Sequence, residues 1–188
     1  MAQDSLNSVL ESQLRELYGR VVWTHKTQEK CADILWRRHS RLKIAQIALS
    51  ALTTTGILVA VFGDCRVVGI ISAILSALLF GINAYTKDYD LGAISQKHSA
   101  AASQIWNIRE SYLSLLTDLR SGTASSKEIT AQRDKLQEKL FNTYKGAPRT
   151  INAAYKEATK GLHLNEELTF SDEEIDHLLP RELRSKVL

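Results

Sequence analysis

Two long runs without a charged residue stand out from the pattern of polar and apolar positions. They cover residues 44–62 and 67–85, nineteen positions each, and only residues 63–66 separate them. At about 1.5 Å per residue, each run is about 28 Å long as a helix, close to the thickness of a bilayer's hydrocarbon core. Because four residues cannot recross a membrane, the pattern predicts a transmembrane helical hairpin with a tight turn at Gly63 and Asp64.

A buried helical hairpin in a soluble protein is the alternative interpretation. The runs are apolar on all sides rather than along one stripe, which favours lipid. Aromatic and basic residues border both runs, as is typical of anchors at a membrane interface: Trp36, Arg37, Arg38, Arg41, Lys43, Tyr85 and Lys87. An anion or nucleotide site is the alternative use of the tryptophan and the arginines. Because the basic cluster precedes the first run, the positive-inside rule predicts that both termini face the cytosol.

Small and polar residues interrupt the apolar character of the two runs. The second run carries a small residue at every fourth position, a spacing that allows another helix to approach closely in lipid: Gly69, Ala73, Ala77 and Gly81. Four polar residues are candidates for lining water in an oligomer, because one two-helix hairpin is too thin to enclose a path: Ser50, Thr53, Thr54 and Asn83. The alternative is that the hydroxyls bond the backbone of their own helix.

The rest of the chain predicts helices, so the expected fold is all-α: a transmembrane hairpin plus a cytosolic bundle of coiled-coil-like helices, assembled as an oligomer. The expected helices cover residues 4–41, 91–119, 126–145, 151–162 and 172–179. We therefore divide the chain into a juxtamembrane helix (1–43), the hairpin (44–85) and a cytosolic helical region (86–188).

The helix expected over residues 91–119 has a heptad pattern. Its apolar positions recur in steps of three and four, with His98 as the polar exception. Such a seam must pack against a partner. We favour the following helix, 126–145, within the same chain, and pairing between subunits is the alternative. A histidine in a seam is expected to fix the register of the pairing and to give a weak sensitivity to pH.

The net charge and a search for known motifs limit the ligands and reactions that we expect of this chain. The net charge of +3 is mild and suits anionic lipid headgroups better than a nucleic-acid surface. The sequence contains no phosphate-binding loop, HExxH motif, Cys/His zinc set or nucleophile elbow, so we expect neither an enzyme nor a cofactor. Arg149, beside a Gly-Ala-Pro break, is a candidate contact for a nucleotide or other anion, since free backbone amides there can help to hold a phosphate. A structural role in fixing the loop is the alternative.

Six short strings in this chain resemble the SLATT family, the two-transmembrane effectors associated with SMODS nucleotidyltransferases and SLOG-type sensors. The strings lie at residues 25–32, 49–56, 71–76, 85–87, 108–112 and 145–150, and the resemblance extends over roughly residues 15–184. It implies a helical protein of the bacterial inner membrane that oligomerises and perforates or depolarises it. It also implies activation by a nucleotide signal made during phage infection, or by a nucleotidyltransferase or sensor protein encoded nearby, with cell death or dormancy as the result.

Three functions remain open at this stage. The first is a gated pore-forming effector of a prokaryotic antiviral, abortive-infection system. The second is a non-conducting membrane-anchored scaffold whose heptad helices recruit a cytosolic partner. The third is a small sensor or transporter subunit that works with a larger channel.

Overall fold

The computed structural model describes residues 2–184 of the chain, and the side chains from residue 7 onward. In this part every regular element is a helix, as the all-α prediction requires. The elements are α1 (Ala2–Phe62), α2 (Arg66–Asp88), α3 (Leu91–Ser121), α4 (Ser126–Gly146), α5 (Asn152–His163), α6 (Asp172–Leu178) and a 3-10 turn at Arg181–Leu183. Residues 1 and 185–188 lie outside the described part; they belong to the predicted regions 1–43 and 86–188.

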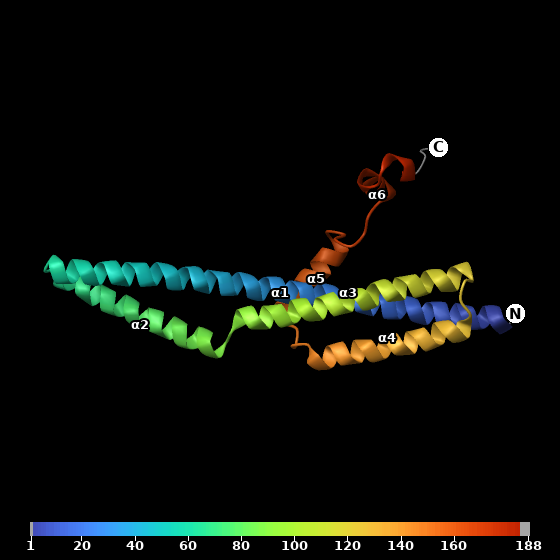
Figure 1. The fold of residues 1–188 in the computed structure, drawn as a ribbon, viewed down its shortest axis with the longest axis horizontal. Helices are drawn as coiled ribbons and strands as arrows, with labels where there is room; N and C mark the ends of the chain where they lie inside the picture. The colour runs from blue at the N-terminus through green and yellow to red at the C-terminus, as the bar shows by residue number, and fades with distance from the viewer. Residues whose placement is uncertain (1, 185–188) are drawn as a thin grey trace.

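The longest element is α1, whose 61 residues form one uninterrupted helix about 90 Å long. It runs through residue 43, where the sequence changes from polar to apolar. The chain reverses within three residues and α2 returns along the apolar end of α1 (Figure 1). Asp64 takes the left-handed backbone conformation in this turn, with φ 49°. Aspartate tolerates that conformation better than most residues, which explains its place in so short a turn.

Beyond α2, the chain keeps its direction and α3 continues along the polar part of α1 (Figure 1). Asp90 begins α3 by accepting a hydrogen bond from the backbone N–H of Ala93 at 2.9 Å. Gly122 ends it in the left-handed conformation, with φ 69°. Ser125 and Glu128 form a capping box at the start of α4, which then runs back along the bundle. We call residues 2–43 of α1 together with α3–α6 the helical body.

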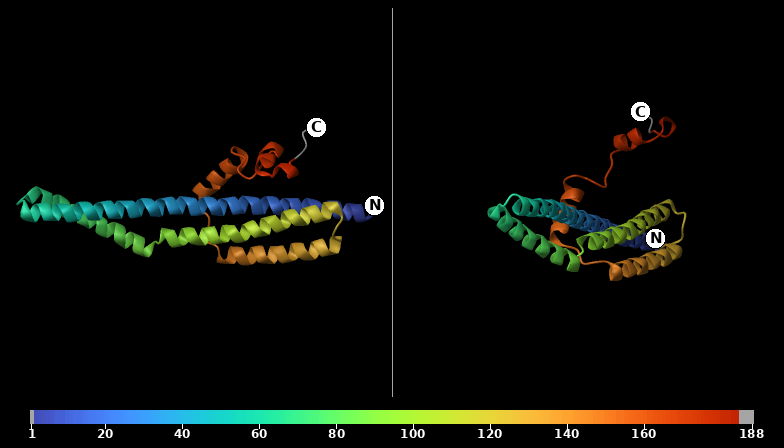
Figure 2. Two further views of the ribbon diagram at one scale, coloured as in Figure 1. Left: turned by 45° about the horizontal axis from the view of Figure 1, so that its top comes forward. Right: turned by 60° about the vertical axis from the view of Figure 1, so that its left-hand side comes forward.

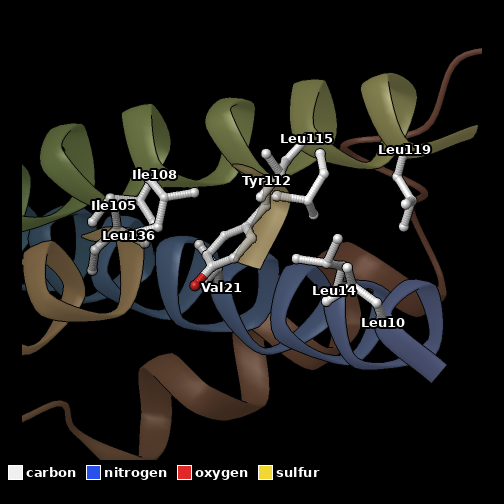
Figure 3. Packing of buried hydrophobic residues seen from close by; sticks show 10 residues of the cluster. Leu10, Leu14, Val21, Ile105, Ile108, Tyr112, Leu115, Leu119 and Leu136 are labelled. Carbon is white, nitrogen blue, oxygen red and sulfur yellow. The ribbon is translucent and has the colours of Figure 1, made fainter. Parts of the chain in front are cut away.

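The heptad seam of α3 is buried between α1 and α4. From His98 to Leu119 each seam position is buried, which confirms the periodicity. As predicted, α4 packs on α3. The prediction missed a second partner, α1, which contacts α3 along a greater length. The sequence analysis treated residues 1–43 as a juxtamembrane helix and did not consider them as a partner for this seam. The core contains side chains from α1, α3 and α4 (Figure 3): Leu10, Leu14, Val21, Ile105, Ile108, Tyr112, Leu115, Leu119, Ile129 and Leu136.

The fifth helix crosses α1 and leads to the side away from α4 (Figure 2). Ala154, Ala158 and Gly161 are buried, and their small size lets α5 lie close to α1. Trp23 of α1 packs on the rings of Tyr155 and His163, with centroids 5.6 and 5.2 Å away. After α5, a turn at residues 164–170 leads to α6, which begins with a second capping box at Ser171 and stands apart from the bundle.

Candidate functional site: membrane hairpin and polar collar

The apolar parts of α1 and α2 lack the protein cover that a soluble hairpin would have. In each of these helices, only 6% of the most apolar 18-residue stretch is buried. Large side chains such as Ile47, Phe62 and Phe80 are 70–84% exposed. Contiguous apolar surface of this length on both helices favours lipid over water.

The predicted anchor residues are exposed at the end of the hairpin nearest the helical body: Trp36, Arg37, Arg38, Arg41, Lys43, Tyr85 and Lys87. Two of them belong to stacked ring pairs, Trp36 on His39 and Tyr85 on Tyr89. Stacked, half-exposed aromatic rings suit the boundary between lipid and water. Contact with headgroups remains a prediction.

Of the residues described below in the contact between α1 and α2, the sequence analysis singled out Asn83, and for a different role. A Cβ at Gly56 would clash with the Ser72 hydroxyl, so the two helices lie close together at this pair. Nearer the helical body, the Gln46 amide donates to Asn83 Oδ1 and Thr86 Oγ1, both at 2.9 Å. Gln46 and Asn83 are polar residues within the two apolar runs, and this pair could have indicated the contact from the sequence.

The four-residue ladder of α2 plays little part in this contact. A Cβ at Gly69 would lie 3.4 Å from Ala60 Cβ, whereas Ala73, Ala77 and Gly81 are exposed. A Cβ at Gly81 would meet nothing within 4 Å. Three of the four predicted packing positions are therefore open to a further helix.

Three of the four candidate pore residues line one hollow. Ser50, Thr54 and Asn83 border it together with Gln46, and its volume is about 630 Å³. Thr54 also donates to the Ser50 carbonyl at 2.9 Å, the backbone bond that the alternative interpretation expected. Thr53 does not border this hollow: it is buried, and its hydroxyl has no hydrogen-bond partner in the described part of the chain.

A second notable region lies in the helical body, where α1 is covered on every side. His25, Lys26, Thr27 and Gln28 are all buried, although four consecutive residues point around the full circumference of a helix. We call these four residues with His98, Arg109 and Glu167 the polar collar. Glu167, from the turn after α5, binds Lys26 at 2.6 Å and Lys30 at 3.1 Å. These two lysines lower the pKa of Glu167 to about 2.

The histidines of the polar collar join α1 to α3. His98 Nδ1 lies 2.5 Å from the Gln28 side-chain oxygen, so this pair sets the register of the two helices. His25 lies 3.4 Å from Arg109 and 3.5 Å from Glu29. Burial lowers the pKa of both histidines, so both rings are neutral at pH 7. The pH sensitivity expected of His98 therefore belongs below its ordinary pKa of 6.5.

Arg149 is exposed and borders a separate hollow of about 450 Å³ near Gln28. Its role as an anion contact remains a prediction. Cys31 is buried, and its sulfur accepts a long hydrogen bond from the Ile151 N–H at 3.5 Å. The strings at 25–32, 108–112 and 145–150 thus meet around one stretch of α1, which sequence separation alone did not indicate.

The fold and these sites define a class: helical membrane proteins with two transmembrane helices and an attached helical body. The model of the SMODS and SLOG-associating 2TM effector domain family 4 matches residues 10–174, and the chain belongs to this family. It is thus a membrane effector domain associated with SMODS and SLOG systems. No curated protein and no solved structure matches the chain.

Proposed function

We propose that this protein is a pore-forming effector of a prokaryotic antiviral system. In this proposal it lies in the inner membrane with both termini in the cytoplasm and permeabilises or depolarises that membrane when triggered. The observation that carries the proposal is the hollow bordered by Ser50, Thr54 and Asn83 on an otherwise apolar hairpin. Polar groups at membrane depth favour a water-filled path or another protein surface over lipid.

A pore requires several copies, because two helices cannot enclose water. Ala73, Ala77 and Gly81 support such an assembly, since they are exposed on α2 and none of them borders the hollow. In lipid, small residues at this spacing let helices pack backbone to backbone. One hairpin therefore offers two different surfaces, a smooth one for packing and a polar one for lining a path.

The trigger in this proposal comes from the associated system. The family name pairs the effector with SMODS and SLOG proteins, which supports a nucleotide signal or a nucleotidyltransferase or sensor protein as partner. Arg149 remains the proposed contact for such a signal. A structural role at the bend between α4 and α5 is the alternative.

The scaffold hypothesis has less support. It required the heptad seam of α3 to be free for a cytosolic partner, whereas the seam is buried against α1 and α4. Recruitment would have to use another surface of the helical body.

The direct test is dye release from liposomes that contain only this protein, with and without a panel of cyclic nucleotides. Release supports the pore, and its absence in both conditions, with protein shown to be inserted, supports the scaffold or a subunit that works with a larger channel. A Ser50→Ala/Thr54→Val double variant should lower single-channel conductance, because it removes two hydroxyls from the hollow. Thr53→Val is the matched control, since Thr53 lies outside the hollow.

A further inference from the structure

The two helix faces that border the hollow of the hairpin each lead to a lysine near the helical body. On α1, Lys43 precedes Ser50 by seven residues, which is about two helical turns, so both lie on one face of the helix. On α2, Lys87 follows Asn83 by one turn and continues the face that borders the hollow.

These two lysines lie at nearly the same depth. Gln46 donates to Asn83 and Thr86, both at 2.9 Å, so this part of α1 is level with the end of α2. Lys43 and Lys87 come within one turn of this link, on the side of the helical body. Both side chains are exposed, and neither forms a salt bridge within the described part of the chain. We call this pair the basic rim of the hollow.

Basic residues outnumber acidic ones at this end of the hairpin. Asp88 and Asp90 lie at the junction of α2 and α3. Asp90 is the N-cap of α3, and Lys43 acts on its carboxylate through space. Five basic residues lie at the same end: Arg37, Arg38, Arg41, Lys43 and Lys87. The net charge beside the hollow is therefore positive.

The hollow itself is uncharged and offers a hydrogen-bond donor. Neither apolar run contains a charged residue, and in the turn between them Asp64 and Arg66 carry opposite charges. The side-chain oxygen of Asn83 accepts from Gln46, so the group of Asn83 that is left for the hollow is its NH₂ donor. Positive side chains line anion pores, whereas cation pores use carboxylates or carbonyl oxygens.

We propose that the hollow conducts small inorganic anions, such as chloride, in preference to cations. This inference rests on the proposed pore and names the class of ion that passes through it. In an assembly each copy adds its own basic rim, and the resulting ring of positive charge raises the local concentration of anions. Lipid phosphates carry the same charge as these ions, so the test separates the two kinds of anion.

The test is the reversal potential of the full-length protein in planar bilayers of phosphatidylcholine, under a KCl gradient and with the cyclic nucleotides used for dye release. We expect chloride to permeate at least about threefold better than potassium. Lys43→Gln/Lys87→Gln should bring this ratio to about one, and Lys43→Glu/Lys87→Glu should favour potassium. The preference of the wild type should shrink between about 0.1 M and about 1 M salt, because the screening length falls from about 10 Å to about 3 Å.

Arg38→Gln/Arg41→Gln is the matched comparison, since it also removes two positive charges from this end of the hairpin. Arg41 precedes Lys43 by two residues and so points to the nearly opposite side of α1. We expect this variant to keep most of the chloride preference. An equal loss in both glutamine variants would show that the total charge at the interface acts on the ions, and would overturn the proposal.

The remaining outcomes separate this inference from the proposed pore. Conductance that favours potassium or neither ion would overturn the inference and leave pore formation intact. Absence of conductance in the wild type, with protein shown to be inserted, would overturn both. In bilayers of phosphatidylglycerol, a persisting difference between the wild type and Lys43→Gln/Lys87→Gln supports lysines that face the ion path. Loss of that difference would assign the basic rim to lipid headgroups and overturn the inference.

Discussion

At the scale of single residues, Tyr112 has a ring that packs in the core and a hydroxyl that is unfavourable there. Its ring reaches from α3 toward Val21 of α1 in the centre of the core (Figure 3). Its hydroxyl is buried without a hydrogen-bond partner in the described part of the chain, and burial raises the pKa of the phenol. The ring stabilises the body through packing, whereas the unpaired hydroxyl costs free energy.

Replacing Tyr112 by phenylalanine should therefore raise the free energy of unfolding by about 1 kcal/mol, because the ring stays and the unpaired hydroxyl is removed. Tyr112→Ala should lower it by about 3–5 kcal/mol through the cavity that it leaves. The measurement is denaturant unfolding in detergent, followed by circular dichroism. Tyr144→Phe, at a 42% exposed tyrosine, is the control and should be neutral. A clear loss of stability in Tyr112→Phe would show that the hydroxyl has a partner.

Glu167 is the second residue with a testable energetic role, because it holds the turn after α5 against α1. Its pKa of about 2 in the folded protein is below the ordinary 4.5, so it contributes stability above pH 4.5. This contribution is lost as the pH falls from about 4.5 toward 2, when the carboxylate takes up a proton.

The variant Glu167→Gln should accordingly have a lower thermal midpoint than the wild type at pH 6. The difference should shrink steadily as the pH is lowered through 4.5. Fluorescence of the wild-type background with Trp36 and Trp106 replaced by phenylalanine reports on the unfolding, since the remaining Trp23 packs on α5. Glu157→Gln, at an exposed position of α5, serves as control. A difference that is the same at pH 6 and at pH 3 would exclude the ion pair as its source.

At the scale of elements, helices could be predicted well and their partners less well. The apolar runs and the heptad steps of α3 are local patterns, and each one appears in the structure. The role of α1 as the main partner of α3 was not apparent, because α1 presents Gln28 and His25 where a coiled coil has apolar residues. Those polar residues contact polar residues on α3. Contacts between helices that are distant in the sequence produce no periodic pattern in either helix.

Local sequence patterns also failed to identify the contact between the two helices of the hairpin. The every-fourth-residue ladder of α2 is conspicuous, yet the close approach to α1 occurs at Ser72, opposite Gly56. Gly146 is the last residue of α4, and Ala147 follows in an extended conformation. With Pro148 next, the extended conformation of Ala147 already ends the helix, so no left-handed residue is needed.

We expect Gly56→Ala to weaken the contact between α1 and α2 by about 1–3 kcal/mol, because its methyl group would displace the Ser72 hydroxyl. Ser72→Ala should restore the contact, since the clashing oxygen is then absent. The readout is disulfide formation between cysteines introduced at Ala60 and Gly69, in a Cys65→Ser background. Gly81→Ala, where the added methyl group meets nothing within 4 Å, should have no effect. Failure of Ser72→Ala to rescue Gly56→Ala would contradict this close contact.

At the scale of the whole molecule, the prediction concerns assembly. The proposed pore requires Ala73 and Ala77 to pack against another copy, so replacing both by leucine should keep copies apart and abolish dye release. The single chain should remain folded, because both positions are exposed. Mass photometry in detergent measures the assembly. Ile71→Phe adds volume on a different exposed face of α2 and should leave assembly intact. Full assembly of the double leucine variant would remove the ladder from the proposal.

The unbroken course of α1 has a consequence for how the two ends of the molecule communicate. Gln46 follows Gln28 by 18 residues, which is about five complete turns, so both side chains face the same side of α1. One meets His98 in the helical body, and the other meets Asn83 in the hairpin. Because α1 is one continuous helix, the rotation of its membrane end about the helix axis is fixed relative to its end in the helical body. A single alanine inserted after Ser40 would turn the membrane end by about 100° relative to the helical body, while four would nearly restore the alignment.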